Sequence, residues 1–307
     1  MEPYLILLAG IAVAAVGGEL FVRGAVGLAT GLRVPPGVIG ATVAAFATST
    51  PELSVALNAA FSGQPELPLG DALGSNVTNV GLVLGLALLM LPMAVNRGDI
   101  RRDLPFAFFA PAATALLILD REVSRFDGAL LVVVFGIWLW MTIRHARRAR
   151  SAAQDVLGEA SVRRAIWVSA GGLACLVVAG RLIVISAKGI GDDLGLDPFI
   201  VGATLVAFGT SAPELATTLI ATLRGHAEVG IGTLIGSNIF NNLWIVGVTA
   251  MVEPIPVRLS EVMIALVASA VVLLFVIPGA SGRLGRGRGA ALVVCYGSYV
   301  GVLVASG

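Results

Sequence analysis

The sequence predicts an all-α integral membrane protein with ten transmembrane helices, arranged as two inverted five-helix repeats with both termini outside. Three observations lead to this fold class: an apolar composition, apolar stretches long enough to cross a bilayer, and a repeat that aligns the first half of the chain with the second. The composition indicates that lipid surrounds the chain. The apolar stretches give the number of membrane crossings, and the repeat gives the symmetry.

The composition favours a chain that is surrounded by lipid. Of its 307 residues, 57% are hydrophobic and only 13% are charged, whereas soluble domains carry about a quarter charged residues. The net charge of +1 gives no reason to expect a nucleic-acid partner. Cys175 and Cys295 stand alone in apolar runs and indicate neither a disulfide framework nor a metal site. We therefore expect a multi-pass protein of the cell membrane, with lipid as a partner and no nucleic acid.

Apolar stretches of spanning length recur along the whole chain, and a bilayer crossing needs about 20 such residues. The N-terminal stretch lacks the basic flank of a signal peptide, so it is interpreted as the first span. The expected spans are 3–31, 37–62, 68–92, 103–120, 126–143, 165–191, 198–223, 229–252, 259–278 and 288–306.

One long basic stretch, 144–164, divides the chain into 1–143 and 165–307, each with five spans. If the N-terminus is outside, the inner loops hold fourteen basic residues and the outer loops hold three. Cytoplasmic loops are enriched in Lys and Arg. This bias predicts that both termini lie outside and that the stretch 144–164 is a cytoplasmic loop.

The two halves repeat each other in sequence. Gly40–Leu53 reads GATVAAFATSTPEL and Gly202–Leu215 reads GATLVAFGTSAPEL, with ten of fourteen positions identical. The same alignment, without a gap, pairs the two GSN triplets at 74–76 and 236–238, so the repeats cover about 37–92 and 198–252. Five spans per half force the second half to insert upside down, which is the plan of many secondary transporters. A duplicated structural or channel protein is the alternative.

Glu52 and Glu214 occupy matching positions in the middle of apolar spans. A charged side chain at the bilayer centre costs about 2.5–3.5 kcal/mol on insertion scales, so such a residue indicates a functional site. Pro51 and Pro213 precede them, and proline cannot donate to the carbonyl one turn earlier. Irregular backbone at this depth is tolerated where it is buried in protein or lines a polar cavity.

Other polar residues follow helical spacing around the two glutamates. Spacing of four residues puts side chains on one helix face, and Ser and Thr on such faces can also simply join helices. In the first half these residues are Thr48 with Glu52, and Asp71, Ser75 and Asn79; in the second they are Thr210 with Glu214, and Thr233, Ser237 and Asn241.

All of these groups offer oxygen, as carboxylate, amide, hydroxyl or carbonyl, and none is a Cys or His. Hard cations prefer such ligands, and Ca²⁺ accepts six to eight of them. A site with two carboxylates is neutralised by one Ca²⁺ or by two Na⁺, which is what an antiporter requires. The ions are substrates, and the sequence predicts no cofactor and no enzyme activity, because the spans contain no Ser–His pair or His cluster.

The motifs ATSTPEL (47–53), GSNVTN (74–79), GTSAPEL (209–215) and GSNIFNN (236–242) resemble the two alpha-repeats of the sodium/calcium exchanger family, prokaryotic type, within the calcium:cation antiporter superfamily. The resemblance extends over nearly the whole chain. It implies an antiporter that exchanges Ca²⁺ for Na⁺ by alternating access, with the first and sixth spans sliding over the rest.

The resemblance also implies a ligand set. Glu52 and Glu214 would bind Ca²⁺ together with the carbonyls of Thr48 and Thr210. The residues implied for Na⁺, besides the two glutamates, are Ala45, Ser49, Ser75, Asn79, Ala207, Ser211 and Ser237. Asn241 stands where some prokaryotic relatives carry an acidic residue, so the site here has one negative charge fewer.

Two further departures from the pattern are Ala47, where glycine is usual, and Thr78, where the second repeat has Phe240. Calcium/proton exchangers tend to carry Gly-Asn before the repeat glutamate, and the Thr-Ser pair here favours Na⁺ as the coupling ion. A Ca²⁺/H⁺ antiporter is the first alternative, and a passive cation channel is the second. The sequence leaves the oligomeric state open, with a monomer among the options.

Overall fold

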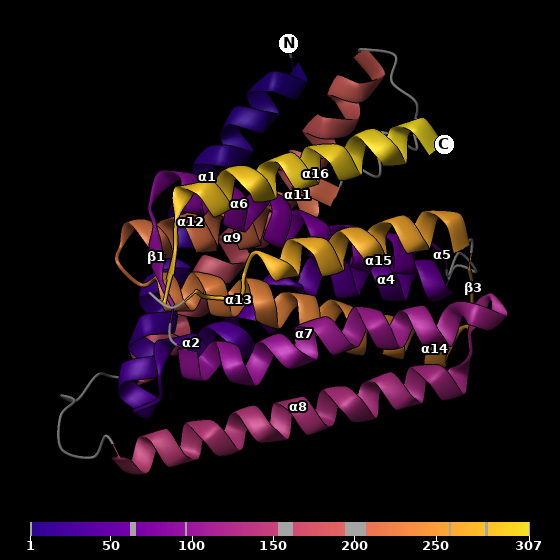
Figure 1. Ribbon diagram of the computed structural model, residues 1–307. Coiled ribbons are helices and arrows are strands. Elements are labelled where there is room, and N and C mark those ends of the chain that lie inside the picture. The colour runs from indigo at the N-terminus through magenta and orange to yellow at the C-terminus, as the bar shows by residue number, and fades with distance from the viewer. Residues whose placement is uncertain are drawn as a thin grey trace.

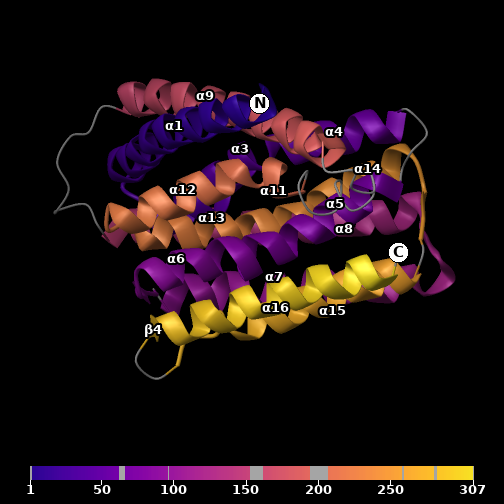
Figure 2. The same ribbon diagram turned by 90° about the horizontal axis from the view of Figure 1, so that it is seen from above.

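The structure is a computed structural model, and it describes residues 2–61, 66–95, 97–152, 162–193, 207–257, 259–279 and 282–306. It is a bundle in which most helix axes lie along one common direction, and α1 is inclined to them (Figures 1 and 2). The elements of the first half are α1 (Glu2–Leu32), α2 (Pro36–Ile39), η1 (Gly40–Ala44), α3 (Ala45–Thr48), α4 (Thr50–Phe61), α5 (Glu66–Val77), η2 (Thr78–Leu84), α6 (Gly85–Met90), β1 (Met93–Ala94), α7 (Arg97–Leu117), η3 (Ile118–Asp120), β2 (Glu122–Val123) and α8 (Arg125–Ala152).

The described elements of the second half follow the same plan. They are α9 (Val162–Asp193), α11 (Ala207–Thr210), α12 (Ala212–Leu223), α13 (Ala227–Ile239), η5 (Phe240–Ile245), α14 (Val246–Val252), β3 (Ile255–Pro256), α15 (Leu259–Leu274), β4 (Arg283–Leu284) and α16 (Arg286–Ser306). The elements η1, η2 and η5 are short π-helices inside longer helices. Such segments occur frequently at functional sites.

Six helical stretches among the described residues are long and apolar enough to cross a bilayer. They are Pro3–Leu32, Leu69–Met90, Arg101–Asp120, Arg125–Ala146, Val162–Leu182 and Ala227–Val252. Two shorter apolar helices are Pro36–Thr48 and Val262–Leu274. The expected spans at 37–62 and 198–223 are each interrupted, at Ser49 and Ser211, and residues 198–206 lie outside the described residues.

The sequence repeat is accompanied by a repeat of the local backbone structure. Ser49 interrupts the helix with φ −86° and ψ 10°, and Ser211 does so with φ −81° and ψ 6°. Each break is followed by a helix of 12 residues, α4 or α12. Because the ring of proline fixes φ at a helical value and leaves no N–H, proline suits the first turn of such a helix and disfavours an uninterrupted one.

The two halves are joined by reciprocal strand pairs. β1 pairs with β4 antiparallel, and β2 pairs with β3 antiparallel. Each pair thus combines the first short strand of one half with the second short strand of the other, and no described strand pairs within its own half.

The buried apolar residues form one main cluster and two smaller ones. The main cluster is centred on α5, η2, α13 and η5, with Leu73, Val80 and Leu234 fully buried. The helices α1 and α9 pack along each other, and their buried residues belong to the smaller clusters. The pair α1–α9 lies beside the main bundle, as Figure 2 shows, and the smaller clusters join it to α2, η1, α12 and α13.

The segment 144–164 differs from the predicted loop. α8 continues through Ala152 and α9 begins at Val162, so the arginines near both ends of this segment lie on helices. Residues 153–161 lie outside the described residues. The apolar part of α8 ends at Ala146, close to the predicted end of the fifth span at 143, and the basic residues that follow continue the same helix.

Candidate cation site

The interruptions at Ser49 and Ser211 place the two repeat glutamates in the first turn of α4 and α12. Free N–H groups and the positive end of the helix dipole favour carboxylates at this position. The preceding helical segments end at Thr48 and Thr210, so their carbonyl ends lie beside the same breaks. Both side chains are buried, with Glu52 1% and Glu214 0% exposed.

Glu214 is held by hydroxyl groups from both halves of the molecule. Ser49 Oγ donates to Glu214 Oε1 over 3.2 Å, and Ser237 Oγ lies 3.4 Å from the same oxygen. Ser237 Oγ is also 3.5 Å from the carbonyl oxygen of Ala45. Four of the predicted site residues thus meet at one point, although 192 residues separate Ala45 from Ser237 in the chain.

This convergence depends on close packing of α13 against α2 and η1. A Cβ atom at Gly236 would collide with the backbone of Ala41, and one at Gly232 would lie 2.6 Å from the carbonyl oxygen of Gly37. Glycine at these positions lets the two backbones touch, which brings Ser237 next to Ala45. The glycines of the second repeat therefore position the polar residue that follows them.

Glu52 has a different environment from Glu214. Within the part of the chain that the structure describes, neither of its carboxylate oxygens has a hydrogen-bond partner, although both are buried. The hydroxyl groups of Ser75 and Ser211, the repeat counterparts of Ser237 and Ser49, are also buried without a partner. Buried polar atoms without partners are rare in native proteins and require an explanation. A bound cation would satisfy carboxylate and hydroxyl oxygens of this kind.

A network of amides lies beside the glutamates. Asn79 Nδ2 donates to Asn238 Oδ1 over 3.2 Å, and Asn238 Nδ2 donates to the carbonyl of Asn76 over 3.1 Å. Asn242 Nδ2 donates to the carbonyl of Asn238 over 3.2 Å. The site prediction did not include Asn76, Asn238 or Asn242. The sequence does point to Asn76 and Asn238, because the GSN triplet places the same asparagine in both halves.

The remaining predicted residues lie at the same level of the bundle. Thr48, Thr210, Ser75 and Asn241 are buried, and both amide atoms of Asn241 lack a partner. Thr48 donates its hydroxyl to the carbonyl of Ala44 over 3.0 Å, and this hydroxyl also lies within hydrogen-bonding reach of the Glu214 carboxylate. Ala207 begins α11, and Ser211 follows this helix.

The polar stripes predicted for the third and eighth spans are only partly at the site. Thr233 donates to the carbonyl of Val229 over 2.8 Å within its own helix, whereas the half-buried Asp71 lies near enough to Glu52 for the two carboxylates to repel each other. No group of three or more His, Cys, Asp or Glu that could hold a metal occurs within the described residues.

Comparison with known proteins identifies the family of this chain. The family model described as sodium/calcium exchanger protein matches residues 3–144 and 164–305. The chain belongs to this family. The two matched segments correspond to the two halves, and the family places the chain among multi-pass membrane proteins.

Individual relatives cover much of the chain. The inner membrane protein YrbG of Escherichia coli (strain K12) is 33% identical over 233 residues, which cover 72% of this chain and 71% of that protein. The sodium/calcium exchanger MaX1 of Methanosarcina acetivorans is 28% identical over 350 residues, with 98% of each chain covered. The sodium-calcium exchanger NCX_Mj, soaked with 2.5 mM Na⁺ and 0.1 mM Ca²⁺, has a TM-score of 0.84 at 29% identity and 99% coverage of both chains.

Proposed function

We propose that this protein is a secondary antiporter that exchanges Ca²⁺ for Na⁺, with both ions bound in turn between Glu52 and Glu214. The observation that carries the proposal is a pair of buried glutamates at matching helix breaks, with buried oxygens of Glu52, Ser75 and Ser211 that have no hydrogen-bond partner among the described residues. Relatives that bear the name exchanger over nearly the full length support the same cargo. The chain would move ions and carry out no covalent chemistry.

The donor set suits both ions. Ca²⁺ takes six to eight oxygen ligands with flexible geometry, and its charge matches two carboxylates. Two Na⁺ ions neutralise the same charge. Because Ca²⁺ and Na⁺ would both use the two glutamates, binding of Ca²⁺ excludes binding of the two Na⁺ ions. The ligands proposed for Ca²⁺ are Glu52 and Glu214 with the carbonyls of Thr48 and Thr210. The other oxygen donors, proposed for Na⁺, are Ala45, Ser49, Ser75, Asn79, Ala207, Ser211 and Ser237. Asn241 is a further proposed member of the site.

We also propose ten membrane crossings, five in each half, with the halves in opposite orientation and both termini outside. The strand pairs support this arrangement. β1 and β2 lie at opposite ends of α7, and β3 and β4 lie at opposite ends of α15. If both halves had the same orientation, β1 and β4 would lie on opposite faces of the membrane and could not pair as they do. Inversion brings β1 to the face of β4 and β2 to the face of β3.

The proposal is tested by uptake of ⁴⁵Ca²⁺ into proteoliposomes loaded with Na⁺, K⁺ or choline, each with and without a pH gradient. We expect uptake only from vesicles loaded with Na⁺. Uptake driven by a pH gradient without Na⁺ would establish a Ca²⁺/H⁺ antiporter instead. Uptake without any counter-ion would indicate a channel, and no Ca²⁺ flux under any gradient would refute the proposed cargo.

A further inference from the structure

The C-terminal part of α12 is covered by α1. Gly18 of α1 lies so close to α12 that a Cβ atom there would be 2.7 Å from Ile220 Cδ1 and 3.2 Å from the carbonyl oxygen of Ala216. Ile220 and Ala216 are four residues apart and therefore share one helix face. This face of α12 is the one covered by α1.

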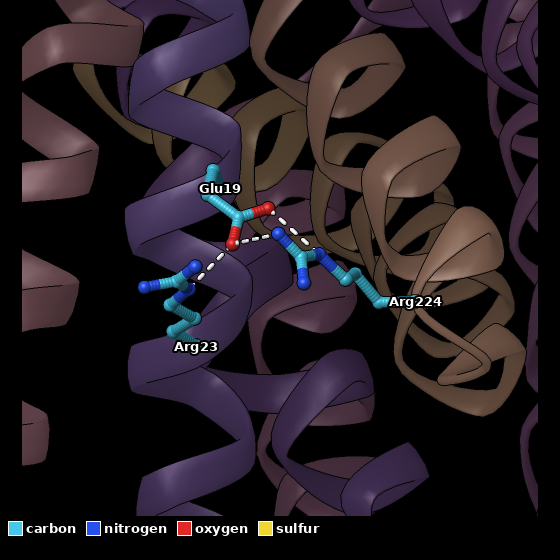
Figure 3. A network of polar contacts seen from close by, with 3 residues as sticks. All are labelled: Glu19, Arg23 and Arg224. Atoms are coloured by element: carbon cyan, nitrogen blue, oxygen red, sulfur yellow. Dashed lines mark hydrogen bonds and ion pairs between the residues drawn. The ribbon is translucent and has the colours of Figure 1, made fainter.

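An ion pair lies beside this crossing. Arg224, the residue that caps the C-terminus of α12, donates Nε to Glu19 Oε2 over 3.0 Å and Nη2 to Glu19 Oε1 over 2.6 Å. Glu19 also pairs with Arg23, one turn further along α1. Figure 3 shows Glu19 between the two arginines, with Arg224 reaching across from the neighbouring helix. The contact to Arg224 joins two helices, whereas the contact to Arg23 stays within α1.

Between this ion pair and the cation site, α12 carries buried hydroxyl groups without partners. Thr217 and Thr218 are both 0% exposed, and neither Oγ1 has a hydrogen-bond partner among the described residues. Thr218 lies against Gly230 of α13. Because successive residues of a helix point about 100° apart, Thr217 lies between the face toward α1 and the face toward α13. Glu214, Thr217 and Arg224 follow one another at spacings of three and seven residues, so they form one polar stripe along α12.

The first half lacks this stripe. In the alignment of the two halves, Thr217 corresponds to Val55, Arg224 to Ser62 and Glu19 to Arg181. An arginine and a serine cannot form an ion pair. The polar stripe and the ion pair are therefore not repeated in the first half, and they exist on one side of the site only.

We propose that the Thr217 stripe is the path by which ions reach Glu214 from the membrane face where α12 ends, and that the Glu19–Arg224 ion pair is the gate that closes this path in the observed conformation. The inference rests on the proposed antiport, which requires access from each face in turn. Under the proposed topology this face is the cytoplasmic one. Opening requires α1 to leave α12, which breaks the bond to Arg224 and leaves the bond to Arg23 intact.

The gate is tested by the accessibility of Thr217→Cys to a membrane-impermeant thiol reagent, in a background with Cys175→Ala and Cys295→Ala. Reconstituted protein without any ion gradient is labelled with and without Glu19→Gln, Arg224→Gln or Arg23→Gln. We expect Glu19→Gln and Arg224→Gln to raise the labelling rate roughly twofold to fivefold, which is the range for loss of one partly exposed ion pair. Arg23→Gln is the matched control and should leave the rate nearly unchanged.

Thr218→Cys provides a second reporter if Thr217→Cys does not fold. No labelling at either position in any variant would overturn the path. Equal acceleration by Arg23→Gln, or none by Glu19→Gln and Arg224→Gln, would overturn the gate. Because labelling needs no flux, the result is independent of the cargo: failure of Na⁺-driven Ca²⁺ uptake with a positive labelling result would refute the proposed ions and retain the gate.

Discussion

The two halves of the candidate site have nearly the same sequence and different hydrogen bonding. Glu214 accepts from Ser49 and Ser237, whereas Glu52 and its counterpart serines, Ser211 and Ser75, have no partners. A protein with two similar halves must adopt an asymmetric conformation to be open to one face at a time. The difference indicates that the motif supplies the groups and that the conformation decides which of them are paired.

The largest effect is expected from removing either carboxylate charge. Glu52→Gln and Glu214→Gln should both reduce Na⁺-driven ⁴⁵Ca²⁺ uptake to the level of empty vesicles, because one carboxylate cannot neutralise a divalent ion. The two variants should fail equally despite their different hydrogen bonding. Full transport by either variant would show that this glutamate is not a ligand.

A smaller effect on stability should separate the two asparagines of the GSN triplets. Asn238→Ala removes a side chain that bonds to Asn79 and to the carbonyl of Asn76, so it should lower the free energy of unfolding by about 2 kcal/mol. Asn76→Ala keeps that carbonyl and removes amide atoms that have no partner, so it should cost less. Thermal unfolding in detergent without Ca²⁺ measures both. Equal losses would contradict the asymmetry.

The smallest effect concerns the serines. Ser237→Ala should destabilise the ion-free protein by about 1 kcal/mol, because a hydrogen bond to Glu214 is lost. Ser75→Ala, its repeat counterpart, should be nearly neutral in the same unfolding assay, since its hydroxyl has no partner. A larger loss for Ser75→Ala than for Ser237→Ala would reverse the comparison.

The sequence predicts the positions of the glutamates and of the helix breaks well, because both depend on local chemistry. A proline removes a backbone donor wherever it stands in a helix, and a carboxylate in an apolar span is costly without a function. The internal repeat then shows that both features occur twice. The packing of α13 on η1 is also signalled, by glycines at close spacing beside the serines.

Contacts between distant residues were not predictable in this way. Glu19 and Arg23 form an acidic and a basic pair inside an apolar span, which implies partners but does not identify Arg224, 205 residues away. Which of two equivalent glutamates is hydrogen-bonded depends on the conformation, so the repeat cannot reveal it. Hydropathy predicts the end of the fifth span at 143, but it does not reveal that α8 continues as a helix through Ala152.

The most direct test of the account is equilibrium binding of ⁴⁵Ca²⁺ to the purified protein in detergent, with Na⁺ as competitor. The account predicts one Ca²⁺ per protein in the wild type, displacement of this ion by Na⁺, and loss of binding in both Glu52→Gln and Glu214→Gln. Ca²⁺ binding that is retained in both variants, or that Na⁺ does not displace, would contradict a shared site between the two glutamates.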